Sequence, residues 1–344
     1  MRNKKEIKCV IWDLDNTIWE GILAESDKLI LNQKVISIIK ILDERGILNS
    51  IASKNDFDVA MKRLKMFGIE EYFIYPEIDW QPKSIAIEKI AKNINIGIDS
   101  IAFVDDQEFE LQEVKYKYKN VETILTRDCH RIPEMSMFNP TIITQESRER
   151  RSLYQNAVKR DVAEKEFVGT QIDFLKQLKM VMTIKQAKEE DLDRVKELTI
   201  RTHQLNTTGY TYSHEELKNF IKDPNYKLYV ADLSDKFGSY GKIGIVLLEC
   251  KEGEWVIKLL LMSCRVMSRG VGNVMVEFLV SGAIKNKVRL TAEFRQTDFN
   301  KLMFITYKML GFKEKMEDKN IEVMEYDFST LRPKQNYIKL VIEE

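Results

Sequence analysis

Residues 8–19 carry the pattern that most constrains this chain, an apolar run that ends abruptly in two carboxylates. The run Cys-Val-Ile-Trp at 9–12 predicts a central strand of a parallel sheet that is covered on both faces. Ligands of such sheets bind at the carboxyl ends of the strands, where Asp13 and Asp15 stand. Because one residue separates them, their side chains leave the same face of an extended chain. Two converging carboxylates suit a magnesium ion, although a bare Asp-x-Asp is also compatible with an ordinary polar turn.

Three later segments supply the other groups that a phosphoryl site needs. Ser53, in Ile-Ala-Ser-Lys-Asn, offers a hydroxyl to a phosphate oxygen, and Lys83 opens an amphipathic helix and neutralises phosphate charge. The run Ile-Ala-Phe-Val ends in Asp105 and Asp106, which are able to complete a metal shell. Each has a simpler explanation taken alone, as a turn serine, a surface lysine or a helix cap. Together, in this order, they indicate a magnesium-dependent phosphoryl-transfer site.

These segments resemble the four motifs of the haloacid dehalogenase-like (HAD) superfamily. The stretches 83–106, 201–209 (RTHQLNTTG) and 261–272 (LMSCRVMSRGVG) are further similar to the FkbH-like family, also called HAD subfamily IIIC. That family joins a HAD-type domain to an acetyltransferase-like (GNAT) domain. Its characterised members load a glyceryl unit from 1,3-bisphosphoglycerate onto an acyl carrier protein. The resemblance covers most of the chain and implies an enzyme of this type.

The resemblance also implies roles for the residues of the first site. Asp13 takes the position of the nucleophile that forms an aspartyl-phosphate, and Asp15 that of the general acid and then base. Magnesium is expected at Asp13, the backbone carbonyl of Asp15 and Asp105, and Asp106 is an open alternative for the last position. The residues expected to hold the phosphoryl group are Ser53, Asn55 and Lys83, and Thr17 is expected to contact the substrate.

From residue 8 to about 125, strand-like and helix-like runs alternate. Such alternation predicts a doubly wound parallel sheet, here of the HAD-like α/β class. The connections after Thr17 and between Ser53 and Lys83 are too short for a sizeable cap, so we expect a capless site that admits a bulky substrate. The expected strands are 8–13, 47–52, 72–75, 100–105 and 121–125, and the expected helices are 34–45, 56–67, 83–94 and 108–117.

The second half of the chain changes its order of elements. An irregular connector is expected at 126–144 and a solvated helix at 145–166, after which an α+β order similar to a GNAT domain begins. We therefore expect a HAD-like domain at 1–140, a helical linker at 141–179 and a GNAT-like domain at 180–344. The expected strands there are 180–185, 227–233, 242–250, 254–263, 288–294 and 321–328, and the expected helices are 189–201, 272–285 and 298–310.

A cysteine is the expected carrier of an acyl group in the second domain. Cys264 follows a strand and precedes a glycine-bearing turn and a helix, where Arg265 and Arg269 would favour a thiolate. Ordinary packing is the alternative explanation for this cysteine. Cys129, beside His130, is the rival thiol.

Two further motifs suggest ligand contacts in the second domain. The turn at 268–272 resembles the GNAT turn that cradles a pyrophosphate. Candidates for binding the substrate or a phosphopantetheine arm are therefore Arg265, Arg269, Gly270 and Gly272. Met267 stands three residues before the first glycine, where acetyltransferases have Arg or Gln, which argues against acetyl-CoA. In the block 201–209 we single out His203 as a candidate base, and Gln204 and Asn206 as candidate substrate-positioning groups.

Charge and composition restrict the partners. The chain has 54 basic and 54 acidic residues, so no overall field attracts nucleic acid or a membrane surface. No apolar run approaches the roughly 18 residues of a membrane span, and the first residues lack the apolar core of a signal peptide. The four cysteines are widely spaced and favour neither zinc nor disulfides. We expect a cytoplasmic enzyme.

Three hypotheses follow from the sequence. The first is an acyltransferase and phosphatase whose partners are a small phosphorylated three-carbon acyl donor and an acyl carrier protein. The second is a HAD phosphatase fused to a working acetyl-CoA-dependent N-acetyltransferase. The third is a scaffold that docks carrier proteins without catalysis, which the complete set of phosphoryl-site motifs disfavours.

Overall fold

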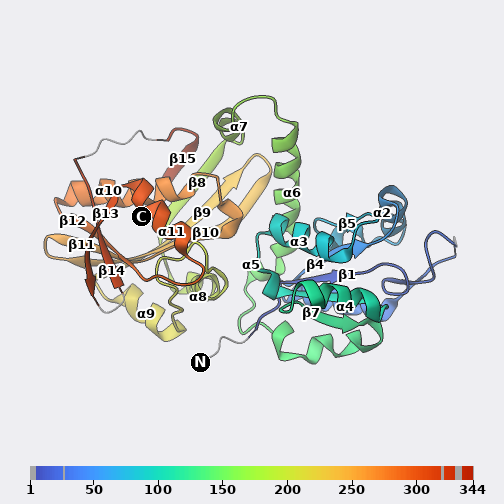
Figure 1. The fold of residues 1–344 in the computed structure, drawn as a ribbon. Coiled ribbons are helices and arrows are strands. Elements are labelled where there is room, and N and C mark those ends of the chain that lie inside the picture. Colours follow the sequence, from blue (N-terminus) through green and yellow to red (C-terminus); the bar gives the residue numbers. More distant parts are fainter. Residues whose placement is uncertain (1–4, 26–27, 319–320, 330–334, 344) are drawn as a thin grey trace. The chain divides into compact units, whose positions relative to one another are not determined.

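The structure of the 344-residue chain is a computed structural model that describes residues 5–25, 28–318, 321–329 and 335–343. The chain divides into two compact units, Met1–Lys159 and Arg160–Glu344 (Figure 1). The stretch expected as a linker is therefore shared between the two units. None of the described helices is long and apolar enough to cross a membrane.

The first unit is built on a five-stranded parallel sheet with the strand order β5-β4-β1-β6-β7. All four residues of the central strand β1 are buried, as its uninterrupted apolar run predicts. This topology confirms the predicted doubly wound α/β sheet. Its strands are β1 (Cys9–Trp12), β4 (Leu48–Ser53), β5 (Glu77–Ile78), β6 (Ile101–Asp105) and β7 (Glu122–Leu125).

Helices cover both faces of this sheet. One apolar core lies under α1 (Gln33–Glu44) and α2 (Phe57–Met66), and a second lies under α3 (Lys83–Ile94) and α4 (Glu108–Lys117). Asn32 begins α1, because its side chain accepts a hydrogen bond from the Val35 amide at 3.4 Å.

The connections that would hold a cap domain are short. Among the described residues between β1 and α1, only the ribbon of β2 (Trp19–Glu20) and β3 (Ile30–Leu31) forms. Between β4 and α3 the chain forms α2, a short 3-10 turn (Glu70–Tyr72) and β5. The expected capless sheet edge is confirmed for the described residues.

Two local expectations are wrong. The edge strand lies at Glu77–Ile78 and not at 72–75, where Phe73 makes a single bridge to Asn49; Tyr75 has a φ of 51°, which breaks the extended run. The helix α6 (Arg150–Glu166) is not solvated on all sides, because Arg150 and Arg160 are buried. The connector before it contains the 3-10 segments Thr126–Glu134 and Ser136–Phe138 and the short helix α5 (Gln145–Arg148).

The second unit is an eight-stranded sheet with the order β13-β14-β12-β11-β10-β9-β8-β15. Its pairs are antiparallel except for β11 with β12 and β8 with β15. This α+β arrangement is GNAT-like, as predicted. The strands are β8 (Met180–Gln186), β9 (Tyr226–Asp235), β10 (Gly238–Lys251), β11 (Glu254–Met262), β12 (Arg289–Phe294), β13 (Phe312–Asp318), β14 (Ile321–Tyr326) and β15 (Ile338–Glu343).

Helices pack on both faces of the second sheet as well. An apolar core between the sheet and α8 (Leu192–Arg201) and α9 (His214–Lys222) covers one face. The larger core on the other face includes residues of α7 (Gln171–Gln177), α10 (Val271–Asn286) and α11 (Lys301–Leu310). Four elements of this unit were not expected from the sequence: α7, α9, β13 and β15.

Candidate active site

Asp13, Lys83 and Asp105 meet at the carboxyl edge of the first sheet. Asp13 follows β1, and its amide donates to the Val104 carbonyl of β6 at 2.9 Å, which fixes the two strand ends side by side. The Lys83 Nζ atom lies 2.6 Å from Asp13 Oδ1 and 2.5 Å from Asp105 Oδ2. All three side chains are buried. The structure therefore brings together residues from three of the sequence motifs.

Helix α3 is anchored so that Lys83 points into this cluster. Pro82 precedes the helix and gives it no side-chain cap. Instead Glu113, on α4, accepts hydrogen bonds from the Ser84 hydroxyl at 2.6 Å and the Ser84 amide at 3.3 Å. This carboxylate satisfies a first-turn amide that would otherwise lack a partner. The sequence analysis missed Glu113, since no local pattern links it to Ser84.

Three carboxylates gather around a single ammonium. One oxygen each of Asp13, Asp105 and Asp106 lies within 4.8 Å of the others. Burial raises the pKa of Asp13 to about 6, against the opposing effect of Lys83. Burial also raises the pKa of Asp105 and of Asp106. Burial opposes the charged form of Lys83, but the two carboxylates beside it raise its pKa, so the ammonium stays charged.

The cluster fits a divalent cation. The three carboxylates carry more negative charge than Lys83 balances; Asp13 and Asp105 are buried and Asp106 is half-buried. The Oδ1 atom of Asp106 is buried and accepts no hydrogen bond from any described residue. A buried acceptor without a donor is costly unless a ligand satisfies it. Hard carboxylate oxygens are the donors that Mg²⁺ prefers, so these residues suit that ion.

Asp15 is held rigidly beside the cluster. Its Oδ1 atom accepts hydrogen bonds from Trp19 Nε1 at 2.8 Å and the Leu23 amide at 3.0 Å, and its Oδ2 atom accepts one from Asn55 at 3.1 Å. Asn55 also donates to the Ser53 hydroxyl at 3.1 Å. The chain turns directly after Asp15, so β2 and the following loop wrap around its carboxylate. Asp15, Ser53 and Asn55 thus form one hydrogen-bonded unit.

Two other residues near this edge have supporting contacts. Thr17 is fully buried, and its hydroxyl lies 2.8 Å from that of Thr126, so its contact is with the protein. Lys54, which follows Ser53, donates to Glu110 of α4 at 2.6 Å. The sequence analysis missed the Lys54–Glu110 pair because the two residues are far apart in the chain.

In the turn at 268–272, the candidate phosphate-binding turn, other side chains of the second unit contact Arg269, Gly270 and Gly272. Arg269 is buried, and its Nη1 atom lies 2.9 Å from Glu164 Oε2. Gly270 has a φ of 76° and begins α10, and the Tyr337 hydroxyl lies where a Cβ atom of residue 270 would stand. The Met262 sulfur lies 3.1 Å from the corresponding point at Gly272.

Within the block 201–209, residues Leu205–Thr207 run along β11, and we call this segment the strap. The Thr207 amide donates to the Leu260 carbonyl at 3.1 Å, and the Met262 amide donates to the Leu205 carbonyl at 2.9 Å. On its other side the Thr207 carbonyl accepts from the Arg295 amide at 3.0 Å. The strap thereby fills the space where β11 and β12 stop pairing.

The remaining candidates of the block 201–209 differ in their surroundings. Asn206 is fully buried, and its side-chain oxygen accepts from the Thr208 and Gly209 amides at 3.1 and 2.8 Å. It therefore supports the end of the strap. His203 is exposed, and the centroid of its ring lies 6.0 Å from that of Phe299. Gln204 is half-buried.

The two candidate thiols also differ. Cys264 lies in the 3-10 turn that follows β11 and is half-buried, and Arg265 in the same turn donates to the Ser263 hydroxyl at 3.3 Å. Cys129 is buried in the first unit, and burial raises the pKa of its thiol. A raised pKa keeps the Cys129 thiol protonated near neutral pH, which is unfavourable for a nucleophile.

Comparison with known proteins adds partial similarities. No protein-family model and no curated protein matches the chain. The N-terminal part of a Bacteroides fragilis protein, which contains a phosphatase domain complexed with Mg, is 28% identical over 37% of this chain and 38% of that one, with a TM-score of 0.33. The chain thus spans under two fifths of that structure.

Two N-acetyltransferases are also similar in part. The ribosomal-protein-S18-alanine N-acetyltransferase of Escherichia coli is 16% identical over 42% of this chain and 92% of that one, with a TM-score of 0.34. The PaiA N-acetyltransferase of Thermoplasma acidophilum, in complex with coenzyme A, is 18% identical over 43% and 99%, with a TM-score of 0.35. By its own sheet topologies, this chain joins a HAD-like α/β unit to a GNAT-like α+β unit.

Proposed function

We propose that the first unit is a magnesium-dependent phosphatase acting on a phosphomonoester. The observation that carries this proposal is the convergence of Asp13, Lys83 and Asp105, with Lys83 Nζ 2.6 and 2.5 Å from the two carboxylates. Asp15 is fixed beside them by three hydrogen bonds. Buried carboxylates with raised pKa values at a sheet edge are typical of catalytic sites.

Asp13, Asp105 and Asp106 would hold the ion, together with the backbone carbonyl of Asp15. Bound there, Mg²⁺ would neutralise charge that develops on the transferring phosphoryl group. Lys83 remains cationic between Asp13 and Asp105 and adds to that neutralisation. Ser53 and Asn55 are placed to contact phosphoryl oxygens.

The reaction runs in two displacements. An oxygen of Asp13 attacks phosphorus, the bond to the leaving oxygen breaks, and Asp15 gives that oxygen a proton. Water then attacks the aspartyl-phosphate while Asp15 takes a proton from it, which releases inorganic phosphate and restores Asp13. The hydrogen bonds from Trp19, Leu23 and Asn55 hold the Asp15 carboxylate in one orientation toward the reacting oxygen during both steps.

The finer proposal follows the resemblance to FkbH-like proteins. The substrate is a phosphorylated three-carbon acyl donor such as 1,3-bisphosphoglycerate, and the product is a glyceryl unit on the phosphopantetheine thiol of an acyl carrier protein. The Cys264 thiolate would displace the acyl phosphate to give a 3-phosphoglyceryl thioester and inorganic phosphate. The carrier thiol would then displace Cys264, and hydrolysis of the 3-phosphate at Asp13 would release a second inorganic phosphate and leave the glyceryl unit. Cys264 is half-buried just after β11, and His203 is the candidate base for this step.

The alternative, an acetyl-CoA-dependent N-acetyltransferase, has less support. Arg269 is paired with Glu164, Tyr337 packs over Gly270, and the strap is hydrogen-bonded to β11. A coenzyme that used this turn and strand edge would first have to displace all three contacts. We therefore expect no retention of coenzyme A during purification.

Phosphate release from 3-phosphoglycerate tests the phosphatase. The purified chain with Mg²⁺ should release inorganic phosphate, and Asp13→Asn should abolish the release while EDTA suppresses it reversibly. Asp99→Asn is the matched control, because Asp99 is exposed and precedes β6 at the opposite sheet edge. Equal rates for wild type and Asp13→Asn would exclude the mechanism.

The acyl-transfer step needs a separate assay. Incubation with 1,3-bisphosphoglycerate, Mg²⁺ and a holo carrier protein should increase the carrier mass by one glyceryl unit. An unchanged carrier beside normal phosphate release would reject the finer proposal and leave the phosphatase intact.

A further inference from the structure

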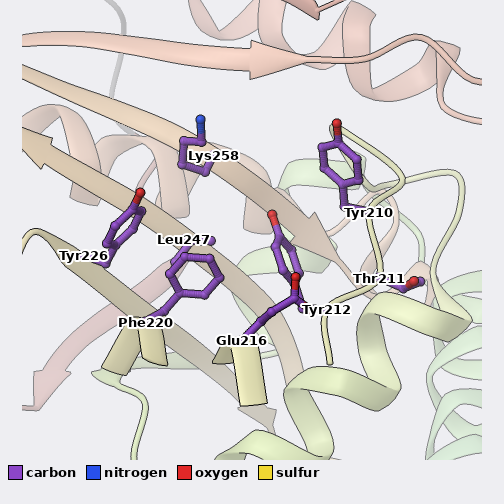
Figure 2. Close-up of a pocket in the computed structure, with 8 residues that line it drawn as sticks. All are labelled: Tyr210, Thr211, Tyr212, Glu216, Phe220, Tyr226, Leu247 and Lys258. Carbon is purple, nitrogen blue, oxygen red and sulfur yellow. The ribbon is translucent and has the colours of Figure 1, made fainter. Parts of the chain in front are cut away.

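A cavity lies in the second unit, lined by residues other than those of the strap and of the turn at 268–272. It has a volume of about 280 Å³ and opens between α9, the loop before it, and strands β9 to β11 (Figure 2). Four aromatic rings line it in series, with centroid separations of 6.4, 5.6 and 4.9 Å. In order along the chain these rings are Tyr210, Tyr212, Phe220 and Tyr226.

Five of the eight residues that line the cavity lie in α9 or in strands β9 to β11, and the other three lie in the loop before α9. The pairing of β10 with β11 shifts register between Leu247 and Leu248, which leaves Lys258 as the extra residue of a β-bulge. A bulge redirects its side chain, and Lys258 reaches the rim of the cavity (Figure 2). A capping box starts α9, in which Glu216 accepts from the Ser213 amide at 2.7 Å, so Glu216 is fixed on the rim as well.

The rim offers both donors and acceptors. The Lys258 ammonium pairs with Glu293 and lies 3.9 Å from Glu249, which also accepts from the Tyr226 hydroxyl at 3.2 Å. Burial raises the pKa of Tyr212, so its hydroxyl stays neutral. That hydroxyl lines the cavity and forms no hydrogen bond within the described part of the chain. It is left to donate to a ligand and to accept from one.

The charges of the rim select a neutral ligand. An anion would meet the Glu216 carboxylate, a cation would meet the Lys258 ammonium, and Glu293 and Glu249 behind Lys258 already offset its charge. A ligand hydroxyl donates to a carboxylate and accepts from an ammonium, so it satisfies both without adding charge. The faces of aromatic rings are electron-rich and attract the C–H groups of a saturated ring. The volume is near the lower end of ligand cavities, which suits a ligand of monosaccharide size.

We propose that this cavity binds a small neutral polyhydroxylated molecule, of monosaccharide or polyol size. Its C–H face packs on Tyr212 and Phe220, and its hydroxyls bond Lys258, Glu216 and the Tyr212 hydroxyl. Every residue that lines the cavity belongs to the second unit, so this site does not rest on the phosphatase of the first. It gives the GNAT-like unit a recognition role that needs neither the strand edge under the strap nor the turn at 268–272.

Saturation-transfer NMR on the full chain tests the site. The probes are methyl glucopyranoside, methyl galactopyranoside and glycerol, with tetramethylammonium and acetate as the charged comparisons. We expect saturable binding of at least one neutral probe and none of the charged ones. Absence of binding by all three neutral probes, or stronger binding of a charged one, overturns the proposal.

Point variants then locate the binding. Tyr212→Phe keeps the ring and removes the hydroxyl, and should weaken binding roughly tenfold, the loss expected for one hydrogen bond. Lys258→Met should weaken binding at least as much. Tyr229→Phe is the matched control, because Tyr229 is half-buried and packs on Phe278 of α10. Wild-type affinity in Tyr212→Phe with a cooperative thermal transition would refute the assignment.

Discussion

Replacing Asp13 by Asn should stabilise the metal-free protein while abolishing catalysis. The pKa of Asp13 is raised by burial from 3.8 to about 6, so the ionised carboxylate is less favourable in the folded protein than in the unfolded chain. A difference of about two pH units is worth roughly 3 kcal/mol, at about 1.4 kcal/mol per unit. Because Asp13 is coupled to Lys83 and Asp105, we expect a gain of about 1 to 3 kcal/mol at pH 7.5.

The sign of the pH dependence follows from linkage. A carboxyl group whose folded pKa is raised contributes stability that is fully present below its unfolded pKa, near 3.8, and is lost as the pH rises through about 6. The advantage of Asp13→Asn should therefore be largest above pH 7 and shrink toward pH 5. Mg²⁺ at about 1,000 times its Kd should reverse the order, since it would stabilise the wild type by about 4.1 kcal/mol and bind the variant poorly.

Urea unfolding in EDTA and in Mg²⁺ measures these differences. The fluorescence of Trp12 and Trp19, both fully buried in the first unit, reports on that unit. The exposed-site control Asp99→Asn should change stability by less than about 0.5 kcal/mol. A metal-free Asp13→Asn protein that is less stable than wild type at pH 7.5 would refute the reasoning about buried charge.

Three further predictions concern the Glu113 contact that positions α3, the Mg²⁺ ligands, and the thiol that carries the acyl group. Glu113→Ala removes the partner of Ser84, so it should cost about 1 kcal/mol in urea unfolding and lower kcat more than KM changes, while Glu113→Gln should recover part of both. Mg²⁺ should raise the Tm of the wild type in thermal scans but leave that of Asp105→Asn unchanged; an equal rise in both would place the ion elsewhere. Cys264→Ser should lose the acyl-enzyme seen by intact-mass measurement, and Cys129→Ser should keep it; persistence of the adduct in Cys264→Ser would eliminate that thiol.

The sequence predicts the first site well because its information is local. Each of Asp13, Lys83 and Asp105 stands at the end or start of an apolar element, and parallel topology then brings those ends to one edge. The supporting residue Glu113 lies on another helix, and nothing in the sequence around it indicates its contact with Ser84. The convergence of these three side chains was thus predictable, while the groups that hold them in place were not.

The second unit was harder to predict for the same reason. The sequence suggests Asn206 as a substrate-positioning group, yet it is fully buried because the strap pairs with β11, about 50 residues later in the chain. Arg269 next to a glycine turn suggests phosphate binding, yet Glu164 of α6 engages it. Helix α9 did have a local signal, the capping box from Ser213 to Glu216. The lining of the aromatic cavity depends on a β-bulge, which sequence patterns do not show.

The central claim is that Asp13 is the nucleophile of a phosphatase, and trapping of the phosphoenzyme tests it most directly. The wild type would be mixed with 3-phosphoglycerate and Mg²⁺, quenched in acid during turnover, and its peptides mapped by mass spectrometry. We expect one phosphoryl group on the peptide that contains Asp13, and none in Asp13→Asn. Steady phosphate release with no phosphorylated Asp13, and an undiminished rate in Asp13→Asn, would contradict it.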